Sequence, residues 1–313
     1  MNESPILLMA PLHGPTQQKL ESAYTVHRLW EAPDAGALIA SLADTCRVVV
    51  TTGGKGIDAA TMAKLPKLAL VACFGVGVDA IDLDYCRKHG VAVTNTPDVL
   101  TDEVADLALA LLLATVRRIP YGDRFVREGR WLKGGMPLTQ SLRGRKVGIV
   151  GLGRIGAAIG RRCEPFGTTI GWHGPRAKPG VSWQYFDDVV DLARWADVLI
   201  AACPGGPETH RLISRAALEA LGPEGIFVNI ARGSVVDQAA MVELLGMGKL
   251  GSAGLDVFDD EPNVPQALIE MENVVLQPHM GSATHVTRTE MGRLVLENVA
   301  AWSEGKPLVT QVV

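Results

Sequence analysis

The sequence predicts an α/β protein with two doubly wound domains, each built on a parallel β-sheet. Short apolar runs alternate with helical patterns along most of the chain, and this spacing is typical of strand–helix–strand units. The runs are continuously apolar, as expected for strands that are buried on both faces. A length of 313 residues corresponds to about two domains.

The first hundred residues contain four apolar runs that we interpret as strands. Helical patterns lie among them at residues 35–43 and 82–90. Strands joined by such helical crossovers pair in parallel. The expected strands are residues 6–10, 46–52, 68–75 and 91–95.

An Ala- and Leu-rich pattern at residues 101–118 predicts one long helix. It begins at Thr101, and the acidic residues Asp102 and Glu103 favour its first turn. An Arg- and Gly-rich connection is expected as far as Leu142. Six further strand signals then describe a second, complete doubly wound domain. These are residues 146–151, 170–174, 197–203, 225–231, 252–258 and 273–278.

Composition and charge are those of an ordinary globular protein. The net charge of −4 and the pI near 6.0 give no reason to expect binding to nucleic acid or an anionic membrane. The five cysteines form no C-x-x-C pair, so neither a disulfide framework nor a zinc site is expected. The N-terminal segment lacks a signal-peptide pattern, and the longest apolar run is too short to span a bilayer. We therefore expect a cytoplasmic protein with no membrane, nucleic-acid or metal partner.

The strongest motif is Gly151-Leu152-Gly153-Arg154-Ile155-Gly156, which directly follows a strand signal and opens a helical pattern. This G-x-G-x-x-G in a strand–turn–helix context is the fingerprint of a Rossmann dinucleotide-binding domain. The first glycine permits a tight turn, the second lets the backbone approach the pyrophosphate, and the third allows close helix–strand packing. The helix N-terminus supplies N–H groups and a positive dipole end for the anion.

The domain organisation follows from this motif. A helical pattern at residues 286–304 and the final segment GKPLVTQVV are expected to return to the first domain. We predict a Rossmann domain inserted in a flavodoxin-like substrate domain. The predicted bounds are 99–284 for the dinucleotide-binding domain, and 1–98 with 285–313 for the substrate domain.

The residues after the second Rossmann strand indicate which dinucleotide binds. NAD enzymes place an acid about twenty residues beyond the glycine turn, where it binds the ribose 2′-hydroxyl. Here that place is occupied by His173, Gly174 and Arg176, and no acid is present. Arg176 and Lys178 could attract a 2′-phosphate instead. The sequence favours NADPH, with NADH as the alternative.

Three later segments place polar residues just past apolar strands. Arg232 lies in NIARGSVVD, Glu261 in GLDVFDDEP and His279 in QPHMGSAT. In an open α/β sheet these positions share the edge where the pyrophosphate turn lies. An arginine fork can hold a carboxylate, and a histidine can protonate the carbonyl oxygen of a 2-keto acid as hydride reaches carbon. A carboxylate bonded to that histidine stabilises its imidazolium form.

GLGRIG, NIARGSVVD, GLDVFDDEP and QPHMGSAT, in this order and spacing, resemble the signature blocks of the D-2-hydroxyacid dehydrogenase family. Within that family the chain most resembles glyoxylate/hydroxypyruvate reductases and the related hydroxyphenylpyruvate reductases. The resemblance implies that Arg232 orients the substrate, His279 donates the proton and Glu261 is its partner. It also implies substrate binding by Val76 and Gly77 through backbone N–H groups, and a cleft lined by Gly53 and Gly54. Further implied cofactor-binding positions are Cys203, Pro204, Thr209, Ile230, Ala231, Asp256 and Gly281.

Two features depart from the family pattern. NADP-type members carry a Ser-Arg or Gly-Arg pair after the second strand, whereas here Arg176 comes one place late. Because the sequence stops at Val313, we do not expect the regulatory C-terminal domain of many phosphoglycerate dehydrogenases. Glu261 argues against formate dehydrogenases, which have glutamine there. The family is typically dimeric, so a homodimer is expected, with Trp131 near the cleft of the partner subunit.

The expected activity is NADPH-dependent reduction of glyoxylate, hydroxypyruvate or a similar small 2-keto acid to the D-2-hydroxy acid. One alternative is an NADH-linked or aromatic 2-hydroxyacid dehydrogenase of the hydroxyphenylpyruvate type. Another, from a different class, is a non-catalytic nucleotide-sensing protein, since a fold alone does not fix function.

Overall fold

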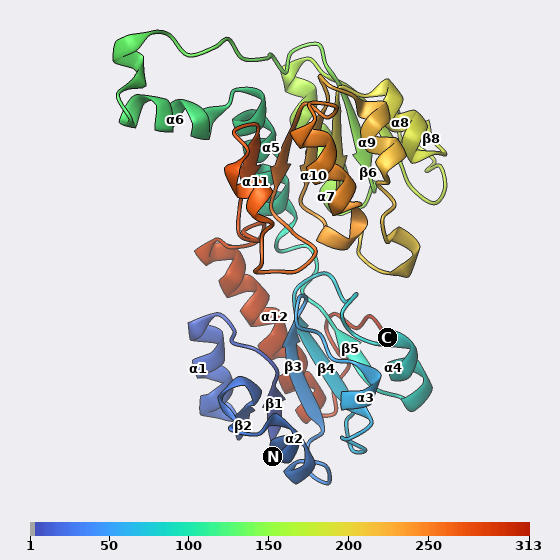
Figure 1. Ribbon diagram of the computed structural model, residues 1–313. Coiled ribbons are helices and arrows are strands. Elements are labelled where there is room, and N and C mark those ends of the chain that lie inside the picture. The colour runs from blue at the N-terminus through green and yellow to red at the C-terminus, as the bar shows by residue number, and fades with distance from the viewer. Residues whose placement is uncertain (1–3) are drawn as a thin grey trace. The chain divides into compact units, whose positions relative to one another are not determined.

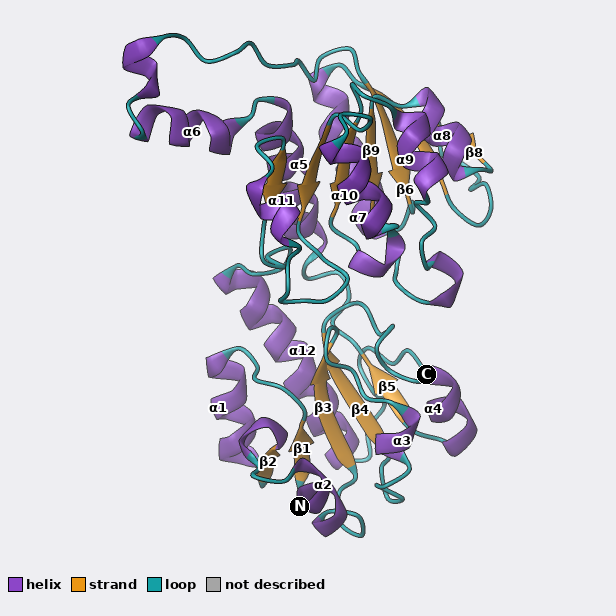
Figure 2. Cartoon of the chain, in the orientation of Figure 1, coloured by secondary structure: helices purple, strands orange, loops and turns teal. Residues whose placement is uncertain are grey.

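The computed structural model describes residues 4–313, and the chain divides into two compact units. Unit 1 comprises the chain up to Leu100 together with Ser282–Val313, and unit 2 comprises Thr101–Gly281. The predicted boundaries at residues 98/99 and 284/285 lie two to three residues from these. Each unit has a parallel sheet with helices on both faces, so the predicted doubly wound α/β class is confirmed (Figure 2).

The sheet of unit 1 has five parallel strands in the order β2-β1-β3-β4-β5, which is the flavodoxin-like order. Ile6 in the inner strand β1 pairs with Val26 on one side and Val48 on the other. The edge strand β2 was not predicted, because three residues with His and Arg among them give no apolar run. The strands are β1 (Ile6–Leu8), β2 (Val26–Arg28), β3 (Val48–Thr52), β4 (Leu70–Phe74) and β5 (Ala92–Thr94).

Helices cover both faces of this sheet (Figure 1). One face packs a core of alternate strand residues, such as Val71 and Cys73, against α2, α3 and α4. On the other face α12 contacts β4, and α1 contacts α12. The helices are α1 (Gly14–Ala23), α2 (Ala35–Ser41), α3 (Ala59–Met62), α4 (Leu83–His89), α12 (His285–Ser303) and the 3₁₀ turn η1 (Leu29–Glu31).

The C-terminal segment returns to unit 1, as the sequence predicts. Thr94 forms an antiparallel bridge with Gln311, and Val93 exchanges backbone hydrogen bonds with Val312 and Val313. The buried side chain of Asn298 on α12 accepts from the backbone of Val309 at 2.9 Å, which ties the segment to the helix.

The sheet of unit 2 has seven parallel strands in the order β12-β11-β10-β9-β6-β7-β8, a Rossmann order extended by one strand. Six of the strands were predicted. The seventh, edge strand β8, was missed because its three residues are flanked by polar and proline-rich sequence. The strands are β6 (Lys146–Val150), β7 (Thr169–His173), β8 (Gln184–Phe186), β9 (Val198–Ala201), β10 (Ile226–Asn229), β11 (Ser252–Leu255) and β12 (Val274–Leu276).

The helices of unit 2 also cover both faces of its sheet. Helix α5 packs against α7, β10 and β11, and α8, α9 and α10 bury their apolar residues in the opposite core. The α-helices are α5 (Thr101–Val116), α6 (Ile119–Arg127), α7 (Arg154–Cys163), α8 (Val189–Trp195), α9 (Arg215–Leu221), α10 (Gln238–Gly246) and α11 (Gln266–Glu270). The 3₁₀ turns are η2 (Arg130–Lys133), η3 (Glu164–Phe166), η4 (Pro207–Thr209) and η5 (Gly233–Val235).

The region after α5 corrects two predictions. The single helix expected over 101–118 ends at Val116, and Arg118 adopts a left-handed conformation with φ +48°. A second helix, α6, then occupies part of the expected connection and extends away from the unit 2 sheet (Figure 1). Several large apolar side chains of this arm are exposed, namely Ile119, Val126, Trp131, Leu132 and Leu138.

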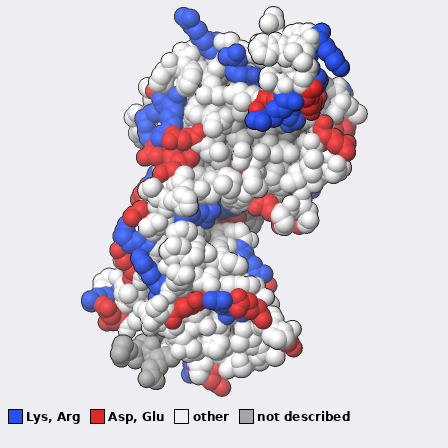
Figure 3. All heavy atoms as spheres, turned by 90° about the vertical axis from the view of Figure 1, so that its left-hand side faces the viewer, with Lys and Arg blue, Asp and Glu red and all other residues white. Residues whose placement is uncertain are grey.

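The surface carries charges of both signs, and the face shown in Figure 3 intersperses them. Within residues 4–313 no helix is long and apolar enough to cross a membrane. All five cysteines are buried, and none of them forms a disulfide. Burial raises the pKa of Cys163 to about 12 and that of Cys203 to about 11, so both thiols stay protonated near neutral pH.

Candidate functional site

The glycine turn of unit 2 has the geometry that a dinucleotide needs. Gly151 has φ +97°, and a Cβ there would lie 2.6 Å from the backbone of Cys203. A Cβ on Gly156 would lie 2.1 Å from the carbonyl oxygen of Gly151, so α7 can approach the turn only with glycine at this position. Gly153, by contrast, faces open space with nothing within 4 Å. The free side of the turn therefore fits a pyrophosphate at the N-terminus of α7.

The remaining residues of the motif lie at the start of α7. Arg154 is its first residue and is exposed, whereas Ile155 is half-buried. Because the backbone N–H groups of a first helical turn have no partner within the helix, they are available to an anion. The residues of this turn thus fit the phosphates of a nicotinamide dinucleotide.

The loop after β7 holds the residues that we expect to face the adenosine ribose. His173 Nδ1 lies 3.0 Å from the carbonyl oxygen of Phe186, and the hydroxyl of Tyr185 donates to the carbonyl of Gly174. Lys178 donates from Nζ to the carbonyl oxygen of Leu152, inside the glycine turn. Arg176 is exposed in the same loop.

Other predicted cofactor positions lie at the carboxyl ends of neighbouring strands in unit 2. Cys203 follows β9 and is buried against Gly151. Thr209 donates through its hydroxyl to the carbonyl of Pro204 at 2.7 Å, which closes the loop after that strand. Ile230 and Ala231 follow β10 and are buried. Their roles as cofactor ligands stay predictions.

Arg232 is held in a turn that Asn229 builds. Asn229 ends β10, is fully buried, and accepts from the backbone N–H of Ala231 at 3.0 Å. Its side-chain amide donates to the carbonyl of Arg232 at 2.9 Å. The guanidinium of Arg232 donates to the carbonyl of Ala231 at 2.7 Å. Asn229 was not among the predicted site residues, although its place at a strand end is the signal that could have indicated it.

His279 and Glu261 are brought together across 18 residues of sequence. His279 Nδ1 lies 2.7 Å from Glu261 Oε2, and the backbone N–H of Phe258 donates to the other carboxylate oxygen at 3.0 Å. Burial alone would raise the pKa of Glu261, but the hydrogen bond and charge of His279, the Phe258 N–H and the charge of Arg232 together hold it below its usual range. Glu261 is therefore a carboxylate near neutral pH.

The loop that carries His279 is fixed by Asp256. His279 has φ +54°, a left-handed conformation that a non-glycine residue rarely adopts. Its backbone N–H donates to the carbonyl of Asp256, and the carboxylate of Asp256 accepts from the N–H groups of Met280 and Gly281 at 2.6 and 2.9 Å. Asp256 is fully buried, and this burial raises its pKa against the effect of the two N–H donors. Its contacts indicate a positioning role for the loop, whereas its predicted cofactor contact stays a prediction.

In unit 1 the turns after β3 and β4 lie side by side. A Cβ on Gly75 would lie 3.2 Å from the backbone nitrogen of Gly53, and Gly54 faces open space. Asn95, which the sequence did not indicate, donates to the carbonyl of Val76 at 3.0 Å. Because a peptide group is planar and trans, this bond directs the Gly77 N–H the opposite way. Neither Val76 nor Gly77 donates a backbone hydrogen bond within residues 4–313.

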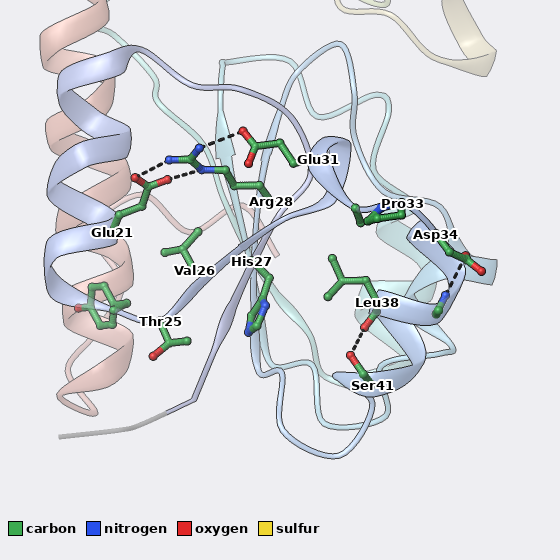
Figure 4. Close-up of a pocket in the computed structure, with 13 residues that line it drawn as sticks. Glu21, Thr25, Val26, His27, Arg28, Glu31, Pro33, Asp34, Leu38 and Ser41 are labelled. Carbon is green, nitrogen blue, oxygen red and sulfur yellow. Dashed lines mark hydrogen bonds and ion pairs between the residues drawn. The ribbon is translucent and has the colours of Figure 1, made fainter.

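A groove of about 1030 Å³ lies elsewhere in unit 1, between α1, β2 and α2. Arg28 forms ion pairs with Glu21 at 2.7 Å and with Glu31 at 2.9 Å. Figure 4 shows its guanidinium between these two carboxylates. The ion pair lowers the pKa of Glu21 and raises that of Arg28. The groove thus contains charges that satisfy one another, and none of the predicted site residues lines it.

Comparison with known proteins agrees with this geometry. The family description "D-isomer specific 2-hydroxyacid dehydrogenase, NAD binding domain" matches residues 109–281. The chain belongs to the D-isomer specific 2-hydroxyacid dehydrogenase family. It is 46% identical over 308 residues to a hydroxyphenylpyruvate reductase of Plectranthus scutellarioides and 44% identical to a glyoxylate/hydroxypyruvate reductase of Arabidopsis thaliana, with 98% of each chain covered. The predicted family is confirmed, and the chain is an oxidoreductase of that family.

A solved structure extends the comparison to the fold. The NADPH-dependent glyoxylate/hydroxypyruvate reductase of Sinorhizobium meliloti, in complex with NADP and malonate, superposes with a TM-score of 0.93. It is 41% identical, and the match covers 99% of this chain and 97% of that one. The match supports the two α/β sheets described above as those of a 2-hydroxyacid dehydrogenase.

Proposed function

We propose that this dehydrogenase reduces a small 2-keto acid, such as glyoxylate or hydroxypyruvate, to the D-2-hydroxy acid with NADPH. The observation that carries the proposal is the His279–Glu261 pair, in which Nδ1 and Oε2 lie 2.7 Å apart and His279 is on a loop that buried Asp256 holds. This pair lies in the same unit as the open glycine turn. A domain that has both an acid–base pair and a dinucleotide turn has the groups needed to reduce a carbonyl group.

His279 is the proton donor in this proposal. When bound, the dihydronicotinamide supplies a hydride to C2 of the keto acid. His279 Nδ1 is engaged by Glu261, so Nε2 is the nitrogen that gives its proton to the carbonyl oxygen. Glu261 stays ionised and stabilises the imidazolium before transfer.

Arg232 and the turns of unit 1 bind the substrate. The guanidinium of Arg232 holds the carboxylate and polarises the carbonyl oxygen. The backbone N–H groups of Val76 and Gly77, which donate to no backbone carbonyl within residues 4–313, bind the carboxylate. Gly53 and Gly54 leave space beside them because they carry no side chain.

The preference for NADPH rests on the loop after β7. No acidic residue lies between His173 and Gly180 to accept a bond from a free 2′-hydroxyl or to repel a 2′-phosphate. Lys178 is tied to the glycine turn, and Arg176 is exposed in the same loop, so two cations are available to the phosphate. The Sinorhizobium meliloti relative is itself described as NADPH-dependent.

The exposed arm after α5 supports a homodimer. Trp131 is 66% exposed and Leu132 is 93% exposed, and Ile119 and Val126 add apolar surface from α6. An apolar patch of this kind on a soluble domain is typical of a protein interface. We propose that a second copy of the chain covers it, and that Trp131 contributes to the partner's site.

Initial rates test the function. Purified protein is assayed at 340 nm with glyoxylate, hydroxypyruvate and 4-hydroxyphenylpyruvate, each with NADPH and NADH. We expect the highest kcat/KM with NADPH and a short keto acid, and His279→Ala should lower kcat by about 10²–10⁴. A preference for 4-hydroxyphenylpyruvate would instead favour the second candidate, which the 46% identical relative suggests. Cofactor binding without turnover on any keto acid would overturn the proposal in favour of a nucleotide-sensing protein.

A further inference from the structure

Arg288 of unit 1 is partly buried and has no acidic partner within residues 4–313. Arg288 lies in the first turns of α12 and is half-buried. Its guanidinium makes neither an ion pair nor a side-chain hydrogen bond within residues 4–313, and burial lowers its pKa. By contrast, carboxylate partners raise the pKa of Arg162 and of Arg293. A cation that is partly removed from water without an anion is costly, so its retention needs an explanation.

The Arg288 side chain lies over an aromatic ring. Its guanidinium carbon lies 5.5 Å from the ring centroid of Phe74. Stacking of this kind engages the flat face of the guanidinium and is worth only about 0.5–1 kcal/mol at partly exposed sites. The N–H donors project in the plane of the group, so they stay available to a planar anion such as a carboxylate.

Phe74 connects Arg288 to the proposed substrate turn. It is the last residue of β4 and directly precedes Gly75, Val76 and Gly77. Strand β4 turns Val71 and Cys73 toward one core, so the alternate residue Phe74 faces α12, where Arg288 lies. Through Phe74, the guanidinium of Arg288 on α12 is thus placed at the same end of β4 as the N–H groups of Val76 and Gly77.

We propose that Arg288 binds the carboxylate of the 2-keto acid together with the Val76 and Gly77 N–H groups, and so determines the preference for acidic substrates. This inference rests on the proposed function. Arg288 binds the part of the substrate that does not react, so it affects substrate affinity more than the chemical step.

The test compares two substitutions at position 288 with a control on the same helix. Arg288→Met keeps an apolar stem over Phe74 but removes the charge and the donors, whereas Arg288→Lys keeps the charge. Arg293→Gln removes an exposed, ion-paired arginine of α12. We expect Arg288→Met to raise KM for glyoxylate and hydroxypyruvate by about 10- to 100-fold, the size of one charge-assisted hydrogen bond. Arg288→Lys should recover part of this loss, and kcat and the Kd for NADPH should change by less than about threefold.

Calorimetric titration of the NADPH complex with oxamate, an unreactive carboxylate analogue, gives a second readout that needs no turnover. Oxamate binding should weaken in Arg288→Met and persist in Arg293→Gln. If the wild-type protein reduces no keto acid, the proposed function fails, and the oxamate titration still decides whether Arg288 binds a carboxylate. A KM or an oxamate Kd in Arg288→Met within twofold of wild type would overturn the proposal, as would no oxamate binding to the wild type. If Arg288→Met does not fold, Arg288→Lys tests the proposal instead, and its KM is expected to rise by about three- to tenfold.

Discussion

Replacement of Asp256 by Asn tests how the catalytic loop is held. The carboxylate accepts from the N–H groups of Met280 and Gly281, and Asp256 is fully buried. An amide presents one oxygen and one NH₂ group, so one of the two backbone donors loses its acceptor. A hydrogen bond to a charged group contributes about 1.5–3 kcal/mol, and relief from burying the charge offsets part of this, which leaves about 2 kcal/mol.

The hydrogen bonds of Asp256 hold His279 in a strained backbone conformation. The left-handed conformation of His279, with φ +54°, costs about 1–2 kcal/mol. When about 2 kcal/mol of restraint is removed, the equilibrium constant for holding His279 in place falls about 10- to 30-fold. We therefore expect kcat to fall by at most about that factor, which is less than the loss expected for His279→Ala. The Tm should fall by roughly 4–8 °C.

The assay is the NADPH-linked reduction of glyoxylate at 340 nm, together with thermal unfolding of the same samples. Asp260→Asn is the matched control, because Asp260 is exposed and its carboxylate accepts a hydrogen bond from the side chain of exposed Asn263. A KM for NADPH that rises while kcat holds would assign Asp256 to the cofactor instead. A kcat within twofold of wild type, with an unchanged Tm, would refute the argument that Asp256 positions the loop.

Three further changes have defined outcomes. Arg232→Ala should lower kcat/KM by at least about 100-fold, because the contacts of Arg232 stabilise both the bound substrate and the transition state. Both kcat and KM should change in steady-state kinetics, and an unchanged kcat or an unchanged KM would contradict this. Because the folded-state pKa of Glu261 is depressed, its pairing with His279 stabilises the protein above pH 4.5, and this contribution is lost as pH falls through the lower folded pKa. Because 34% of the Glu261 side chain is exposed, this contribution to stability is below about 1 kcal/mol. The free energies of unfolding of Glu261→Gln and of the wild type should therefore converge in acid. A difference that stays constant with pH would argue against a stabilising Glu261–His279 pair. Gly233→Ala places a Cβ 2.0 Å from the carbonyl carbon of Phe258. The free energy of unfolding, measured in urea, should therefore fall by more than about 3 kcal/mol. A smaller fall would mean that the turns of Gly233 and Phe258 can move apart.

The sequence alone determined the fold class and the family. Long apolar runs reveal inner strands because a strand covered by helices on both faces must be apolar throughout. The glycine turn can also be recognised from the sequence, because its backbone leaves no room for other residues. A Cβ on Gly151 or on Gly156 would overlap neighbouring backbone atoms. Arg232, Glu261 and His279 could be named because each lies in a short motif just past a strand.

Only the tertiary structure decided the edges of the sheets and the arm. Strands β2 and β8 are three residues long and carry polar side chains, so pairing with a neighbour, rather than an apolar pattern, makes them strands. The sequence predicts a connection where α6 lies, because Pro120, Gly122 and several arginines interrupt any helical pattern. It is stabilised by contacts such as the ion pair of Arg127 with Asp123 at 2.8 Å.

The supports of the site were also decided by tertiary structure. Asn229 and Asp256 accept backbone N–H groups of the turns that carry Arg232 and His279, and Asn95 fixes the carbonyl of Val76. No sequence motif identifies such residues, because each of them acts by forming a hydrogen bond to a backbone group that only the fold brings near. The sequence therefore names the groups that can react, while the packing of the chain determines which buried polar side chains hold those groups in place.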